Sequence, residues 1–154
     1  MNNRGFSLME LLIVIALIGI LSALGTFGFA QYSRKSQMTN QTRLLYGDLM
    51  EYRLKSMYEK KNWTFKISPG SYGIYSSVDI TVAPVRTVTL KHNVESSNPI
   101  KIVFDTQGGL KSGNQSVCVT SANDAVVDSV VISETRVRIG KKGTSCDTDH
   151  IVAK

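Results

Sequence analysis

Hydrophobic side chains fill the first part of the chain almost without interruption. After a short segment, Met1 to Gly5, an apolar block runs from Phe6 to Ala30 and contains one charged residue, Glu10. A helix needs about 20 apolar residues to cross a membrane, and this block supplies them. A carboxylate inside such a helix costs a few kcal/mol in lipid, so we expect Glu10 to have a partner.

Two simpler interpretations of this block are an ordinary secretory signal and a plain membrane anchor. An ordinary secretory signal has an apolar core of about 7–15 residues, followed by a cleavage site with small residues. The block here is longer and carries Glu10 inside it, which disfavours an ordinary signal. A plain membrane anchor fits the length and is compatible with a more specific role.

The polar stretch that begins at Gln31 continues the helical pattern. No proline occurs before Pro69, and apolar side chains recur at spacings of seven, four and three residues: Met38, Leu45, Leu49 and Tyr52. These positions form one stripe that can pack on a sheet. We expect the helix to end near Lys60. The charged residues of this stretch lie mostly off the stripe and are expected on the solvated face: Arg34, Lys35, Arg43, Asp48, Glu51, Arg53 and Lys55.

Beyond Asn62 the pattern changes to short runs rich in β-branched and aromatic residues, separated by turn residues. The candidate strands are Trp63–Ile67, Gly73–Tyr75, Ile80–Val82, Arg86–Lys91, Ile100–Phe104, Val117–Thr120, Ala125–Ser133 and Thr135–Ile139. Turns are expected at Gly108-Gly109 and at Ser112-Gly113-Asn114. Because the connections are short, antiparallel pairing is favoured. The sequence therefore predicts an α+β fold with a long N-terminal helix and an antiparallel β-rich C-terminal head.

The length of 154 residues limits the number of domains, and the net charge of +6 bears on possible partners. We expect one domain beyond the apolar helix: a leader at 1–5, an apolar helix at 6–30 and a head at 31–154, whose helical part ends near 60. A mildly basic charge suits contact with anionic polymers or lipid surfaces but is most often a matter of solubility.

Two cysteines, Cys118 and Cys146, lie in the distal half of the chain. A domain that the apolar helix holds on the outer side of a membrane meets an oxidising compartment, so we expect a disulfide between them. The alternative is a zinc site, because His150 is four residues from Cys146 and His92 could act as a fourth ligand.

Catalytic motifs are missing from the sequence. There is no nucleophile constellation, Gly-rich phosphate loop, HExxH or CxxC. Asp105, in IVFDTQGG, is interpreted as a strand end that enters a turn. We therefore expect no enzymatic activity, no cofactor and no metal.

The run from Gly5 through Phe6, Ser7, Leu8 and Met9 to Glu10, followed by LLIVIALIGIL, resembles the class III signal of type IV pilins and type II secretion pseudopilins. In that family a prepilin peptidase cuts after the glycine, and the new N-terminus is methylated. The glutamate at the fifth mature position pairs with the N-terminal amine of a neighbouring subunit. The resemblance implies cleavage after Gly5, N-methylation of Phe6 and an assembly role for Glu10.

The apolar helix departs from that family at one position. Many relatives have a proline at mature position 22, where the helix can loosen on assembly. This chain has Phe27 there, between Gly25 and Gly28. Each glycine weakens a helix by roughly 1 kcal/mol, which still permits local loosening.

The last third of the chain carries a second resemblance, to the GspH/FimT family of minor pilins and pseudopilins. The matching features are the run Ile100–Asp105, Gly108, a strand with Cys118, the run Val130–Ser133, and Arg136 with Arg138. Some pilus members of that family bind DNA through basic residues around a Gly-Arg-x-Arg motif. Here Thr135 replaces the glycine, while both arginines remain.

The basic residues of this segment give the DNA hypothesis a physical basis. On a strand, Arg136 and Arg138 would project from the same face. Lys141 and Lys142 would extend that positive surface into a loop suited to phosphate contact. The alternative is an edge strand protected by charge against aggregation.

Both resemblances imply a minor pilin or pseudopilin. Such a subunit is stored in the bacterial inner membrane with its head in the periplasm, and then enters or caps a type IV pilus or a type II secretion pseudopilus. The implied partners are other pilins or pseudopilins, the prepilin peptidase and the inner-membrane assembly platform. The alternative hypothesis is a pilus-borne DNA-binding minor pilin for DNA uptake in natural transformation.

Overall fold

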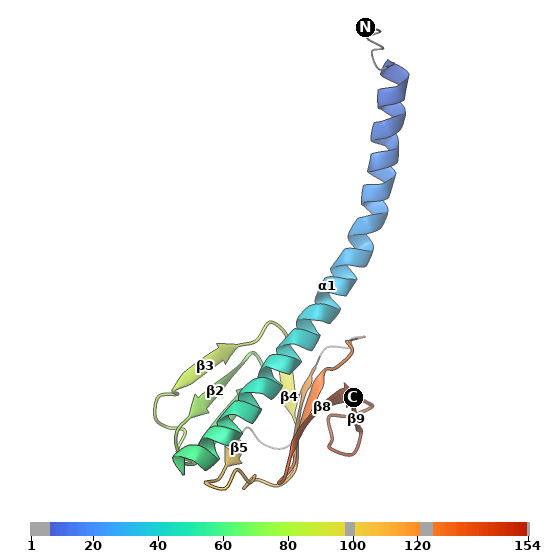
Figure 1. The fold of residues 1–154 in the computed structure, drawn as a ribbon. Coiled ribbons are helices and arrows are strands. Elements are labelled where there is room, and N and C mark those ends of the chain that lie inside the picture. Colours follow the sequence, from blue (N-terminus) through green and yellow to red (C-terminus); the bar gives the residue numbers. More distant parts are fainter. Residues whose placement is uncertain (1–6, 98–100, 121–124, 154) are drawn as a thin grey trace. The chain divides into compact units, whose positions relative to one another are not determined.

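One long helix dominates the first part of the computed structural model, which describes residues 7–97, 101–120 and 125–153. Helix α1 runs over Leu8–Glu59 without a break (Figure 1), and its backbone is helical at Gly25 and Gly28; loosening at these glycines on assembly stays a prediction. The helix ends one residue before the predicted Lys60. Lys60 itself has a φ of 53°, the left-handed conformation that commonly terminates helices.

The chain divides into two units, Met1–Arg34 and Lys35–Lys154. The second unit, which we call the head, contains the second half of α1 and all the described strands. The strands are β1 (Trp63–Ser68), β2 (Ser71–Tyr75), β3 (Arg86–Thr89), β4 (Val94–Ser96), β5 (Lys101–Phe104), β6 (Gln115–Val119), β7 (Ser129–Ile132), β8 (Val137–Lys142) and β9 (Ile151–Ala153).

The strands of the head form two antiparallel sheets. The first has four strands in the order β3-β2-β1-β5, and the second has five in the order β4-β6-β7-β8-β9. In Figure 1, β2 and β3 lie to one side of the green half of α1, and β8 and β9 to the other. Every pairing between named strands is antiparallel, for example Phe65 with Ile74 in the first sheet and Val117 with Val130 in the second. The α+β prediction with antiparallel sheets is confirmed.

A single main core joins α1 to both sheets. The predicted helix stripe is confirmed, because Met38, Leu45, Leu49 and Tyr52 are all buried in this core. Tyr52 contacts Trp63 and Phe65 with ring centroids 4.8 and 5.7 Å apart. Such aromatic pairs add about 0.5–1.5 kcal/mol each beyond the burial of their area, so they help to fix the helix on the first sheet.

Asp48 corrects the prediction of a solvated charged face. Its side chain is buried, accepts a hydrogen bond of 2.5 Å from the Tyr72 hydroxyl, and lies 3.4 Å from the Arg86 guanidinium. A buried carboxylate needs such partners, since an unpaired one would cost several kcal/mol. Asp48 therefore links α1 to β2 and β3 rather than facing solvent.

The turn after β5 confirms the interpretation of Asp105. Its Oδ1 accepts hydrogen bonds of 2.8 Å from the backbone N–H groups of Gln107 and Gly109. Gly108 has a φ of +75°, and a Cβ there would lie 2.8 Å from the Met57 side chain. The Asp and Gly of this motif thus have a structural explanation: they build a tight turn that packs on the end of α1.

Several strand predictions are wrong in detail. Ile80–Val82 is not a strand but part of the loop between β2 and β3, and residues 125–128 lie outside β7. The strand predicted at Thr135 begins at Val137. The short strands β4 and β9 were not predicted, and the predicted strand start Ile100 lies outside the described residues.

Candidate functional site

The N-terminal residues implicated in processing, Gly5 and Phe6, lie outside the described residues. The structure describes the chain from Ser7, whose carbonyl oxygen accepts hydrogen bonds from the N–H groups of Glu10 and Leu11 at 3.0 and 3.2 Å. Ser7 and Glu10 have the Ser-x-x-Glu spacing of a capping box. This signal is present in the sequence, and it gives Ser7 a role in starting α1 that the sequence analysis did not assign.

Glu10 lies in the first turn of α1. The unpaired N–H groups at a helix N-terminus favour a negative charge there, by about 0.3–1 kcal/mol at an exposed site. The Glu10 side chain is exposed, so a group from outside this chain can reach its carboxylate.

The apolar helix is uncovered on all sides. The side chains of residues 7–23 are exposed all round the helix, and an 18-residue window of α1 has a mean hydropathy of 2.5 with none of it buried. By length and composition this helix could cross a membrane. A helix that is apolar all round has to be covered by lipid or by other apolar helices.

The distal basic residues are arranged differently from the prediction. Arg136 precedes β8 and lies in the turn after β7, where its carbonyl oxygen accepts a hydrogen bond of 2.8 Å from Ser133. The two arginines therefore do not share a strand. Arg136 is exposed, whereas Arg138 is half-buried and its buried Nε has no hydrogen-bond partner among the described residues.

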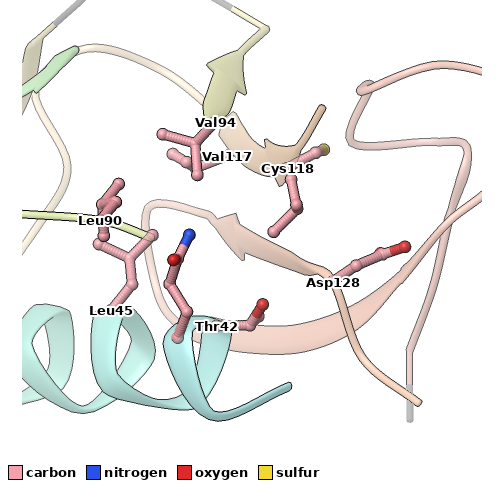
Figure 2. Close-up of a pocket in the computed structure, with 9 residues that line it drawn as sticks. Thr42, Leu45, Leu90, Val94, Val117, Cys118 and Asp128 are labelled. Atoms are coloured by element: carbon pink, nitrogen blue, oxygen red, sulfur yellow. The ribbon is translucent and has the colours of Figure 1, made fainter. Parts of the chain in front are cut away.

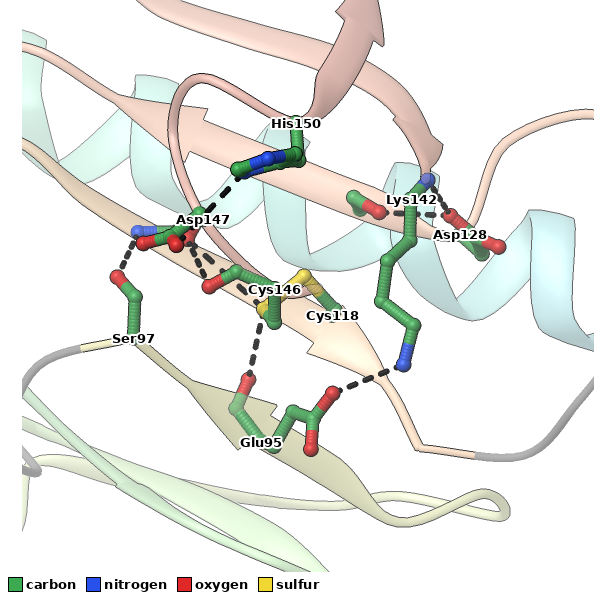
Figure 3. Close-up of a disulfide and its surroundings, with 10 residues drawn as sticks. Glu95, Ser97, Cys118, Asp128, Lys142, Cys146, Asp147 and His150 are labelled. Atoms are coloured by element: carbon green, nitrogen blue, oxygen red, sulfur yellow. Dashed lines mark hydrogen bonds and ion pairs between the residues drawn. A yellow bond between two sulfur atoms is a disulfide. The ribbon is translucent and has the colours of Figure 1, made fainter. Parts of the chain in front are cut away.

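Lys141 and Lys142 lie within β8 rather than in a loop, and they pair with Val152 and Ile151 of β9. Lys142 also forms an ion pair of 2.9 Å with Glu95 (Figure 3). Since β8 lies between β7 and β9, the alternative of a charged edge strand is wrong. Of the four basic residues, only Lys142 has an ion pair within the part of the chain that the structure describes, whereas Arg136, Arg138 and Lys141 have none.

A disulfide joins Cys118 of β6 to Cys146 in the loop between β8 and β9 (Figure 3), which confirms the predicted bond. Cys118 is buried with Val131 and Ile151 in a small second core, and the Ser116 hydroxyl donates a hydrogen bond of 3.0 Å to the Cys146 carbonyl. The zinc alternative is wrong, because both sulfur ligands are bonded to each other.

The seam between α1 and the second sheet holds a small cavity of about 10 Å³ (Figure 2). Thr42 and Leu45 line it from the helix, with Leu90, Val117 and Asp128 among the facing residues. This volume accommodates about one water molecule. The seam is therefore a packed contact and has no room for a substrate.

The chain is similar to known proteins in its N-terminal motif, in its sequence and in its fold. A profile of the prokaryotic N-terminal methylation motif matches residues 1–26. A fimbrial protein of Neisseria meningitidis (serogroup A, serotype 4A) is 34% identical over 95 residues, which are 60% of this chain and 52% of that protein. The chain thus spans about half the length of this relative.

The fold is similar to crystal structures of the type IV minor pilin FimU of Pseudomonas aeruginosa. One, in space group P21, has a TM-score of 0.61 and 12% identity, and the match covers 75% of this chain and 99% of that one. Another, in P65, has a TM-score of 0.55 and 15% identity, over 70% and 98% of the two chains.

Proposed function

We propose that this chain, which is a type IV pilin-like protein, is a minor pilin that assembles into, or at the tip of, a type IV pilus or a type II secretion pseudopilus. The observation that carries the proposal is an exposed Glu10 in the first turn of an uncovered apolar helix. The N-terminal methylation motif over residues 1–26 supports the same role.

The assembly step follows from the chemistry of this helix end. Cleavage after Gly5 by a prepilin peptidase would create a new amine on Phe6, which would then be methylated. The amine of one subunit and the Glu10 carboxylate of its neighbour would be opposite charges in an apolar setting. Pairing them would offset the cost of burying either one alone.

The remaining partners follow from the same role. Before assembly the apolar helix would lie in the inner membrane with the head in the periplasm, and the inner-membrane assembly platform would extract it. In the filament, other pilins would replace lipid around the apolar side chains.

To test this proposal, Glu10→Ala is compared with the unchanged chain in its host. We expect normal processing but about a tenfold or greater loss from sheared pili, since a lost pairing of 1.4 kcal/mol shifts an equilibrium tenfold. Mass spectrometry of the N-terminus reports processing, and immunoblotting of sheared pili reports assembly.

Glu51→Ala is the matched control, because Glu51 is an exposed glutamate on the same helix. This variant should assemble normally. Gly5→Ala should block processing. Normal amounts of the Glu10→Ala variant in sheared pili would contradict the assembly role.

A second candidate function is DNA binding during uptake. Arg136 and Arg138 favour it, because neither has an ion pair among the described residues and phosphate groups could supply the missing negative charge.

A further inference from the structure

The apolar part of α1 ends in two aromatic side chains and an arginine. Phe29 and Tyr32 are 73% and 70% exposed. Arg34 is also exposed and has no ion pair among the described residues. We call these three residues the boundary cluster. All of them belong to the first unit of the chain, so they form one exposed segment of a single helix.

The sequence changes character at the boundary cluster. No charged residue occurs between Glu10 and Arg34, and the only polar side chains from Leu11 to Ala30 are those of Ser22 and Thr26. Tyrosine is enriched where a membrane meets water, because its ring is apolar and its hydroxyl is polar. The cluster therefore has the composition of the end of a membrane-spanning segment.

The length of the uncharged segment matches a bilayer. Glu10 and Tyr32 lie in one unbroken helix, and at about 1.5 Å per residue roughly 33 Å separates them along its axis. The hydrocarbon core of a bilayer is about 30 Å thick. When Tyr32 lies at one surface of the core, Glu10 therefore reaches the other. A shift of the helix by two turns would draw Glu10 or Arg34 into the hydrocarbon, which is unfavourable for a charged side chain.

We propose that the boundary cluster binds the headgroups of anionic phospholipids and, with Glu10 at the opposite surface, sets the depth of the helix in the membrane before assembly. This inference rests on the proposed function, in which the stored subunit spans the inner membrane. With Tyr32 at the edge of the hydrocarbon, Arg34 lies about 3 Å further out, within a headgroup layer roughly 5–7 Å thick. Its guanidinium can donate two parallel hydrogen bonds to one phosphate group.

The three side chains of the cluster have different tasks in this contact. Phe29 lies about one helical turn deeper than Tyr32 and packs among the acyl chains. The Tyr32 hydroxyl donates a hydrogen bond to a phosphate or ester oxygen of the headgroup layer. The positive charge of Arg34 favours anionic lipids over neutral ones. The cluster thus selects a lipid by its charge rather than by its shape.

The lipid contact is tested with the full-length chain in phosphatidylcholine vesicles that contain a trace of lipid with an acceptor dye on its acyl chain. A fluorescent donor is attached at Ala30→Cys, beside the cluster. The native cysteines are bonded to each other and do not react. We expect labelled phosphatidylglycerol to be enriched around the donor about fivefold over labelled phosphatidylcholine, the effect of one basic residue near an anionic surface.

Arg34→Gln should abolish this enrichment. Arg43→Gln is the matched control, because Arg43 is an exposed arginine further along the same helix, and it should leave the enrichment unchanged. Equal energy transfer to both labelled lipids, or an enrichment that survives Arg34→Gln, would refute the lipid contact. The assembly proposal would be unaffected, since it depends on the separate Glu10→Ala experiment.

The depth of the helix is the second readout. The midpoint between Glu10 and Tyr32 is Leu21, which is 69% exposed. With the dye at Ile15→Cys, Leu21→Cys or Ala30→Cys in separate chains, quenchers at the bilayer centre should act most strongly on Leu21→Cys. Strongest quenching at Ile15→Cys would place the helix about 9 Å from the proposed depth and overturn it. A chain that does not enter the vesicles at all would refute membrane storage and the lipid contact together.

Discussion

At the scale of single residues, the cluster of Asp48, Tyr72 and Arg86 connects the helix to the first sheet. Burial, and then the hydrogen bond and negative charge of Asp48, raise the pKa of Tyr72 well above its usual range. The Asp48 carboxylate in turn raises the pKa of Arg86. The phenol is thus held protonated, so that it donates to the carboxylate.

The first prediction concerns Tyr72→Phe, which removes the hydroxyl donor to Asp48. We expect the free energy of unfolding to fall by about 1–2 kcal/mol at neutral pH, because a buried acceptor loses its partner. Denaturant unfolding of the head, followed by circular dichroism, measures this change. Tyr75→Phe, on the same strand but outside the cluster, should change stability less.

The same variant should alter stability at alkaline pH. Folding raises the pKa of Tyr72, so protonated Tyr72 stabilises the folded state fully below its unfolded pKa of about 10. This stabilisation is lost progressively as the pH rises above about 10. Above pH 10, ionisation of Tyr72 should lower the free energy of unfolding of the unchanged protein by up to about 1.4 kcal/mol per pH unit. The Tyr72→Phe variant should not show this decrease. Equal slopes for both proteins above pH 10 would contradict this linkage.

Asp48 also shows where sequence patterns stop being informative. The stripe of Met38, Leu45 and Leu49 was predictable, because helical periodicity is a local property of neighbouring residues. The burial of Asp48 was not, since its partners are 24 and 38 residues away in the chain. A charged residue off the apolar stripe predicts a solvated side chain, and only the folded structure shows that the Tyr72 hydroxyl compensates the buried carboxylate.

At the scale of elements, the strand predictions fail where a segment becomes a strand only if a partner strand lies beside it. Ile80–Val82 has strand-like residues, but Asp79 satisfies the backbone and hydroxyl of Thr81 locally, and Pro84 follows. Such local hydrogen bonds compete with a strand ladder. In contrast β9, only three residues long, forms because it pairs with β8 next to the disulfide.

A prediction at the scale of elements concerns that disulfide. Replacing Cys118 and Cys146 together by alanine should lower the free energy of unfolding by about 2–4 kcal/mol, since the bond closes a loop between two residues that are 28 positions apart in the sequence. Denaturant unfolding measures the loss. Limited proteolysis should show faster cleavage within residues 143–150, which the bond holds against the second sheet.

Reduction of the unchanged protein is the companion measurement. It should reproduce the destabilisation of the double alanine variant and should leave that variant itself unaffected. Equal stability of the oxidised and reduced protein would show that the bond is not what holds β9.

At the scale of the whole molecule, the net charge of +6 attracts polyanions in general, so DNA binding alone would say little about a specific site. The informative quantity is the dependence on salt, because each neutralised phosphate releases counterions. The structure leaves Arg136, Arg138 and Lys141 as candidates and places Lys142 in an ion pair; the two arginines are tested because they form the motif that the sequence resemblance names.

The DNA prediction follows from this distinction. If the second candidate function holds, Arg136→Ala with Arg138→Ala should weaken duplex DNA binding by the detergent-solubilised chain and reduce the salt slope by about 2. Fluorescence anisotropy across a salt series measures both. Lys61→Ala with Lys111→Ala removes two positive charges elsewhere in the chain and serves as the control. If both double variants lower the DNA affinity and the salt slope equally, binding is a non-specific charge attraction.

Arg53 has a mechanical consequence for the whole head. From the last turns of α1 it donates to the carbonyl of Gly108, in the connection from β5 to β6, and to that of Thr135, in the connection from β7 to β8. One side chain thereby fastens loops of both sheets to the same point on the helix. A force applied along α1 would therefore act on the loops of both sheets through this one side chain.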